Sequence, residues 1–102
     1  MASRPISYRP EAVRELEEAE KWYRDRDDGL GDRWLEEAGR TIESIVGHPE
    51  LWAVDKSGAR EVLVHHFPYV IAYRLHRDFI EIVAVADTSR RRGYWRRRLR
   101  KA

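Results

Sequence analysis

The sequence predicts an α+β fold in the order β-α-α-β-β-β, with two antiparallel helices packed on one face of a mainly antiparallel, twisted sheet. Two observations support this prediction. Apolar residues recur at three- and four-residue steps up to about residue 49, and beyond residue 60 they alternate with a period of two, as helices and strands respectively require. A length of 102 residues suits one domain, so we expect residues 1–102 to share a single core.

A short strand and a helix begin the chain. In "RPISY", Ile6 and Tyr8 lie on one side of an extended segment. Pro10 suits the first helical position because the N–H that proline lacks would have no partner there. The helix should run to about Arg26. Its predicted apolar stripe consists of Val13, Leu16, Ala19 and Tyr23, widened by Ala12 and Trp22.

A second amphipathic helix follows "DDGLG", a sequence that we expect to break the first helix. This second helix should end at Gly47-His48-Pro49, and residues 50–59 should form a loop. Because the connection between the helices is short, they should be antiparallel neighbours. The apolar stripe predicted for the second helix comprises Leu30, Trp34, Leu35, Ala38, Ile42, Ile45 and Val46.

Three strands are expected after residue 59, where β-branched and aromatic residues are enriched. If residues 77–78 form a two-residue turn, the numbers of opposed residues in the last hairpin add up to 155, and Arg74 faces Glu81. The face predicted to meet the helices carries Tyr69, Ile71, Tyr73, Leu75, Ile80, Ile82, Ala84 and Ala86. The opposite face, free for solvent or a ligand, carries Val70, Ala72, Arg74, His76, Phe79, Glu81, Val83, Val85 and Asp87.

Several classes of site are excluded by composition. The chain has no cysteine, so disulfides and thiolate metal sites are ruled out. No apolar segment resembles a signal peptide or a membrane span, and we expect a cytoplasmic protein that does not bind membranes. We also expect no cofactor and no metal, since phosphate loops and metal-spaced histidines are missing. His65 and His66 are adjacent and, on a strand, would point to opposite faces, where they cannot bind one ion together.

The C-terminal segment "RRRGYWRRRLRKA" holds eight cationic side chains, and no acidic residue occurs from Arg90 onward. Such a segment favours a nucleic acid or an acidic protein as partner, although it can also be a solvated charge run. We expect Trp95 to anchor it on the body, while Tyr94 or the neighbouring arginines stay exposed and outside the core. The residues predicted to bind the target are Arg90, Arg91, Arg92, Arg96, Arg97 and Arg98.

Arg74 allows two interpretations. As the cross-strand partner of Glu81, it contributes about 0.2–1 kcal/mol if exposed, which is enough to explain both residues. Alternatively, Arg74 lies with Arg60 and the terminal arginines on an open sheet face, where they form a cationic concavity for a phosphate chain.

Four segments occur in an order and spacing that resembles the RelE/ParE superfamily of type II toxin-antitoxin toxins. They are "PEAVRELEEAEKWY", "GLGDRWLEEAGRTIESIVGHPEL", "FPYVIAYRL" and "VAVADTSRRRGYW", and the ParE-like branch is the most similar. The resemblance implies a small bacterial toxin that arrests growth or stabilises a plasmid. It also implies a cognate antitoxin that wraps the toxin and forms a hetero-oligomer with it.

The resemblance leaves two mechanisms open. RelE-like members cleave mRNA in the ribosomal A site, whereas ParE-like members inhibit DNA gyrase. The superfamily positions that carry nuclease chemistry correspond here to Arg60, Arg74, Asp87, Arg90 and Tyr94.

Two features favour the ParE-like function. Asp87 occupies a position where many members have histidine, and an ionised aspartate repels phosphate. Tyr94 could act as an acid only if its neighbours lowered its pKa. RelE-like nucleases also present several lysines, whereas Lys56 is the only lysine between Lys21 and Lys101. A third possibility is a degenerate toxin that only binds its partner or DNA.

Overall fold

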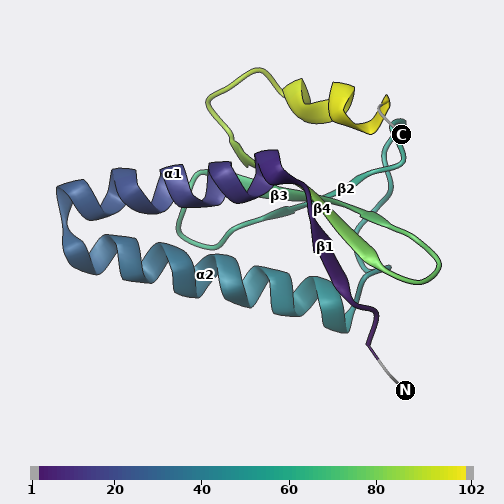
Figure 1. Cartoon of the computed structure of the whole chain (residues 1–102), viewed down its shortest axis with the longest axis horizontal. Coiled ribbons are helices and arrows are strands. Elements are labelled where there is room, and N and C mark those ends of the chain that lie inside the picture. Colours follow the sequence, from purple (N-terminus) through teal and green to yellow (C-terminus); the bar gives the residue numbers. More distant parts are fainter. Residues whose placement is uncertain (1–2, 101–102) are drawn as a thin grey trace.

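The computed structural model describes residues 3–100 and confirms the predicted order of elements (Figure 1). The four strands form one sheet in the order β1-β4-β3-β2, and they span β1 (Ile6–Tyr8), β2 (Arg60–Leu63), β3 (Tyr69–Leu75) and β4 (Ile80–Asp87). The sheet is mixed, because β1 runs parallel to β4 while the other two pairings are antiparallel. A 3₁₀ helix, η1 (Tyr94–Arg100), was not predicted.

Helices α1 (Pro10–Arg26) and α2 (Asp28–Gly47) lie side by side on one face of the sheet (Figure 1). The break between them is shorter than predicted, because it involves only Asp27 and the rest of "DDGLG" belongs to α2. Asp27 has an extended backbone and accepts the N–H of Gly29 at 2.8 Å, so it is the N-cap of α2. Within the described part of the chain, no helix has the length and apolar composition needed to cross a membrane.

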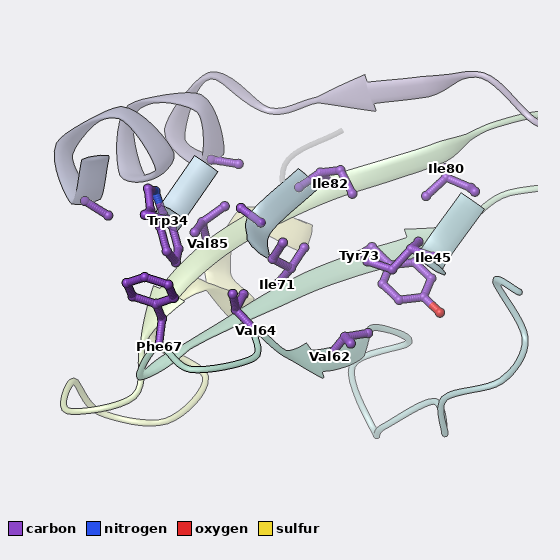
Figure 2. Close-up of a cluster of buried hydrophobic side chains, with 13 residues drawn as sticks. Trp34, Ile45, Val62, Val64, Phe67, Ile71, Tyr73, Ile80, Ile82 and Val85 are labelled. Carbon is purple, nitrogen blue, oxygen red and sulfur yellow. The ribbon is translucent and has the colours of Figure 1, made fainter. Parts of the chain in front are cut away.

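The main core lies between the helices and the sheet, and Trp34 of α2 packs beside Phe67 at one end of it (Figure 2). Trp34 is fully buried, and its indole N–H donates to the carbonyl of Leu16 at 3.1 Å. Its ring packs against those of Phe67 and Tyr69, at centroid distances of 5.4 and 4.6 Å. The predicted helix faces are therefore correct for the hydrophobic residues that are fully buried, which are Ala12 and Ala19 of α1 and Trp34, Ala38 and Ile45 of α2. Three residues assigned to the stripes are exposed, namely Val13, Trp22 and Leu35. Three residues of α2 outside the predicted stripe are buried instead, namely Gly31, Glu37 and Thr41.

The predicted register of the last hairpin holds for only half of its length. Arg74 faces Glu81 as expected, but a β-bulge in β4 between Ile82 and Ala84 shifts every later pair by one residue. Val85 consequently belongs to the main core, and Asp87 pairs with Tyr69 at the helix side of the sheet. The predicted faces are wrong for four residues beyond the bulge, which are Ala84, Val85, Ala86 and Asp87.

Candidate functional site

The face of the sheet away from the helices is covered by the C-terminal segment. Trp95 of η1 is 1% exposed and packs into a second cluster with Ala72, Val83 and Ala84. The alanines leave the space that an indole ring requires. Trp95 thus anchors the basic segment as predicted, whereas the prediction of an open face is wrong over this part of the sheet.

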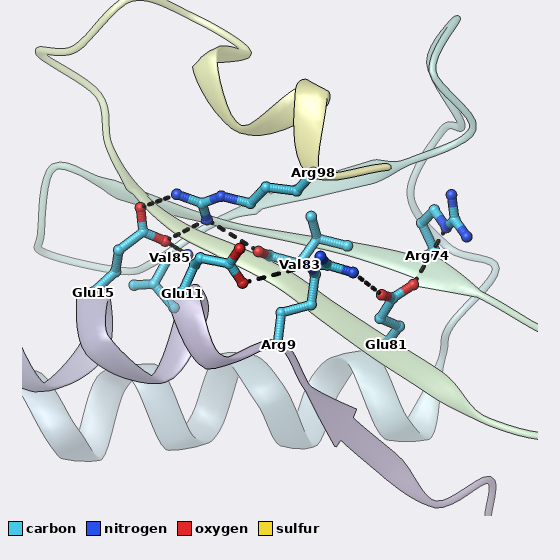
Figure 3. A network of polar contacts seen from close by, with 8 residues as sticks. All are labelled: Arg9, Glu11, Glu15, Arg74, Glu81, Val83, Val85 and Arg98. Atoms are coloured by element: carbon cyan, nitrogen blue, oxygen red, sulfur yellow. Dashed lines mark hydrogen bonds and ion pairs between the residues drawn. The ribbon is translucent and has the colours of Figure 1, made fainter. Parts of the chain in front are cut away.

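Glu15 of α1 binds the same segment through ionic contacts (Figure 3). Both carboxylate oxygens accept from the guanidinium of Arg98 at 2.9 Å, and the hydroxyl of Tyr94 donates to one of them. Glu15 also accepts the backbone N–H of Val85 at 3.0 Å, just beyond the bulge. The side chains of Glu15 and Arg98 are 12% and 14% exposed. Arg98 therefore stabilises the fold and does not lie outside the core, contrary to the prediction for the terminal arginines.

The hydroxyl of Tyr94 is held in its protonated state. Burial, followed by the hydrogen bond to Glu15, raises the pKa of Tyr94 to about 12. The guanidinium of Arg90 lies 3.7 Å from the centre of the ring, but its charge does not reverse this shift. An acid catalyst at neutral pH would need a shift in the opposite direction.

Three of the five nuclease candidates lie together. Asp87, Arg90 and Tyr94 line a cavity of about 450 Å³ between α1 and the end of β4. The same cavity is lined by two further carboxylates, those of Glu15 and Glu18. Glu15 is already paired with Arg98, but Asp87 and Glu18 still outnumber Arg90, so this space disfavours a phosphate group.

Arg60 and Arg74 lie apart from this cavity and from each other. Arg60 pairs with Tyr73, whose side chain points into the main core, and it donates to the carbonyl of Trp52 at 2.6 Å. It thereby fixes the loop between α2 and β2. Arg74 approaches Glu81 at 3.3 Å on the other face (Figure 3). The expectation that both arginines share one concavity is therefore wrong.

A cationic hollow does form around Arg74. It has a volume of about 730 Å³ and is lined by Arg74 together with Lys56, Arg92, Arg96 and Arg100. Asp55 also lines it and binds Arg96 at 3.0 Å, which fixes one of these guanidinium groups. The second interpretation of Arg74 placed it in a cationic concavity with Arg60 and the terminal arginines. Arg74 and the terminal arginines do line one hollow, but Arg60 is not part of it.

Five arginines of the C-terminal segment remain exposed. We call them the basic surface, and they are Arg90, Arg91, Arg92, Arg97 and Arg100. By contrast, Arg96 and Arg98 are only partly exposed and have acidic partners in the body, Asp55 and Glu15. Arg92 lies 3.6 Å from Glu61, but the Arg92 side chain is 84% exposed, so this pair contributes little. Of the six residues predicted to bind a target, four thus belong to the basic surface and two hold the segment in place.

Sequence reasoning missed the residues that position the segment. Gly93 has a φ of 73°, and a side chain there would collide with the guanidinium of Arg96. Glu15 is not among the residues that the sequence predicts for the site. The available signals were a glycine inside an arginine run and a carboxylate spaced four residues from Glu11 on the helix that begins after the first strand.

Comparison with known proteins places this geometry in a family. The family model described as "ParE toxin of type II toxin-antitoxin system, parDE" matches residues 6–92. A solved structure described as "Chromosomal ParDE TA system from P. aeruginosa" has a TM-score of 0.67 at 12% sequence identity, and the match covers 83% of this chain and 96% of that one. At this identity the likeness concerns the fold. A search of curated protein sequences gives no match.

The matched residues include both long helices and all four strands, whereas η1 lies beyond them. The predicted resemblance is thereby confirmed for the body of the protein. The chain belongs to the ParE toxin family of type II toxin-antitoxin systems.

Proposed function

We propose that the chain acts as a toxin that inhibits DNA gyrase and that a cognate antitoxin neutralises it. Membership of the ParE toxin family carries this proposal. The fold shared with the ParDE structure from P. aeruginosa supports it, since the match covers nearly all of that chain.

The arrangement of the nuclease candidates favours gyrase over RNA as the target. RNA cleavage by the 2′-hydroxyl needs a base, an acid and cations around one phosphate. Here Arg60 binds loop carbonyls, and the hydroxyl of Tyr94 keeps its proton and donates to Glu15. Asp87 and Arg90 share a cavity with two other carboxylates. This arrangement supports an inhibitor that acts by binding.

The basic surface gives the antitoxin and the target a common feature to recognise. Its five exposed arginines are held on a folded scaffold by Trp95 and by the Glu15–Arg98 pair. A fixed cluster of like charges attracts an acidic segment and lowers the entropy lost on binding. We therefore expect an antitoxin whose toxin-binding segment is acidic, forming a hetero-oligomer that blocks this surface.

A supercoiling assay with purified gyrase tests the proposal. The chain should stop the conversion of relaxed to supercoiled plasmid, and addition of the antitoxin should restore it. Because a basic protein can also inhibit by coating DNA, relaxation of the same plasmid by a type I topoisomerase is the control, and it should proceed unchanged. Uninhibited gyrase, together with new mRNA 5′ ends during expression, would instead show a ribonuclease.

A further inference from the structure

Glu37, His65 and His66 place their ligand atoms within 4.8 Å of one another. Glu37 belongs to α2, and the two histidines lie in the turn that follows β2. We propose that these three residues bind a divalent transition-metal ion of the Zn²⁺ type. The site is independent of the proposed function, because none of its residues belongs to the basic surface or to the cavity around Asp87.

The turn brings the two histidines together. A strand would direct adjacent side chains to opposite faces, which is why the sequence indicated that they could not share an ion. Strand β2 ends at Leu63, however, and His66 has a φ of 69°. The two imidazole rings consequently lie on the same side of the chain, with centroids 3.8 Å apart. The sequence argument against a metal assumed that both histidines lie on a strand, but β2 ends before them at Leu63.

The donor set selects a class of metal. Imidazole nitrogens suit Zn²⁺, Ni²⁺ and Cu²⁺, whereas Mg²⁺ and Ca²⁺ prefer oxygen ligands throughout. Two imidazoles and one carboxylate are also a common set of three protein ligands around zinc, with water in the fourth position. The present spacing is wider than direct coordination requires. Both histidines are exposed, so their side chains are free to close around an ion.

Glu37 gives the site a fixed point in the body of the protein. It is 9% exposed, and its position on α2 is set by the packing of that helix. Its ionic partner is Arg40, at a distance of 3.6 Å, and the Arg40 side chain is 69% exposed. Because the pair is long and its Arg40 partner is solvated, it contributes little and yields easily to a metal ion. A bound ion would then join the turn after β2 to α2.

The test uses the full chain without an affinity tag, because polyhistidine would bind the same ions. After treatment with a chelator, the protein is titrated with ZnCl₂ in a calorimeter, with MgCl₂ as a parallel titration. Thermal unfolding is followed with and without Zn²⁺. We expect one Zn²⁺ per chain, a melting temperature that rises with Zn²⁺, and no response to Mg²⁺, since a ligand that binds only the folded state stabilises it.

Variants assign the ion to these residues. Glu37→Gln, His65→Ala and His66→Gly should each weaken Zn²⁺ binding at least tenfold, whereas His48→Gln, at an exposed histidine elsewhere, should leave it unchanged. His66→Gly is the decisive variant because glycine accepts the positive φ without strain, so the metal-free protein keeps its stability. The proposal is overturned if the wild type shows no saturable Zn²⁺ binding, or if His66→Gly binds as tightly as the wild type.

Discussion

At the scale of residues, the carboxylate of Glu15 accepts hydrogen bonds from both β4 and η1. It lies at the end of α1 nearest the first strand, where the helix faces the C-terminal segment (Figure 3). The pair that it forms with Arg98 is bidentate and largely shielded from water. Pairs of this kind depend on both partners, because an unpaired charge in such a place is costly.

Glu15→Gln should lower the free energy of unfolding by about 3 kcal/mol, because Arg98 would remain in a shielded position without a counter-charge. Glu17→Gln, at an exposed position of the same helix, should change it by less than about 0.5 kcal/mol. Urea denaturation of the two variants and the wild type provides the measurement. Equal stability of Glu15→Gln and the wild type would show that the pair does not hold the segment.

Glu81 makes the folded protein less stable when the pH becomes acidic. Burial alone would raise its pKa, but hydrogen bonds from His76 and Arg9 and the charge of Arg74 outweigh burial and hold the pKa below its usual value of 4.5. The stability that this carboxylate contributes is therefore fully present above pH 4.5 and is lost as the pH falls through the lowered pKa.

Glu81→Gln should reduce the fall in melting temperature between about pH 5 and pH 3. The fall should not disappear, because the pKa of Asp55 is also lowered in the folded chain. Melting curves across this pH range test the expectation, with the exposed Glu36→Gln as control. A pH profile parallel to that of the wild type would mean that Glu81 has no such role.

At the scale of elements, η1 determines whether the basic residues form a surface or a tail. Its only fully buried residue among those described is Trp95, which fills the space over Ala72 and Ala84. Tyr94 and Leu99 pack at the edge of the same cluster, and Arg96 and Arg98 add ionic contacts to the body. Removal of the indole should therefore release the element while α1, α2 and the main core stay folded.

Trp95→Ala should cost about 3–5 kcal/mol, as truncations of large buried aromatics do. Trp22→Ala, at a tryptophan that is 50% exposed, should cost about 1 kcal/mol or less. Limited digestion with trypsin gives a direct readout, because the arginines of η1 become cleavable when the element is released. Resistance of Trp95→Ala equal to that of the wild type would contradict the anchoring role.

Element order was predictable from the sequence, whereas local backbone irregularities were not. The change of apolar period from 3.6 to 2 indicated two helices followed by three strands, and Pro10 marked the start of the first helix. The bulge in β4 left no signal, because apolar residues occupy both faces of "IEIVAVA" and either register buries them. The same limitation applies to His65 and His66, whose proximity depends on a positive φ in a turn.

The anchoring of the C-terminal segment was predictable from the sequence, whereas the ion pairs of its individual arginines were not. Arginine density identified the C-terminal segment, and the anchoring by Trp95 was predicted. Which arginines are exposed depends on acidic partners far away in the sequence, such as Glu15 for Arg98. Glu15 and Arg98 are 83 residues apart in the sequence. Their contact depends on how all the helices and strands between them pack, and the sequence pattern alone does not give that packing.

At the scale of the whole molecule, the two oppositely charged parts of the sequence meet in the fold. Residues 11–43 hold 12 acidic and 6 basic side chains, and residues 90–102 hold eight basic and no acidic ones. The net charge of +2 conceals this separation. Glu15, from the acidic part, binds Arg98 of the basic segment, and the five arginines of the basic surface remain exposed.

We propose that the exposed arginines engage the target, whereas Arg96 and Arg98 hold the fold. Two variants separate these roles, one with glutamine at Arg91, Arg92 and Arg97 and one with glutamine at Arg96 and Arg98. The most direct measurement is gyrase inhibition by both proteins, reported beside their melting temperatures. The first variant should inhibit at least tenfold less with an unchanged melting temperature, and the second should melt about 10–20 °C lower. Full inhibition by the first variant, or an unchanged melting temperature in the second, would contradict the claim.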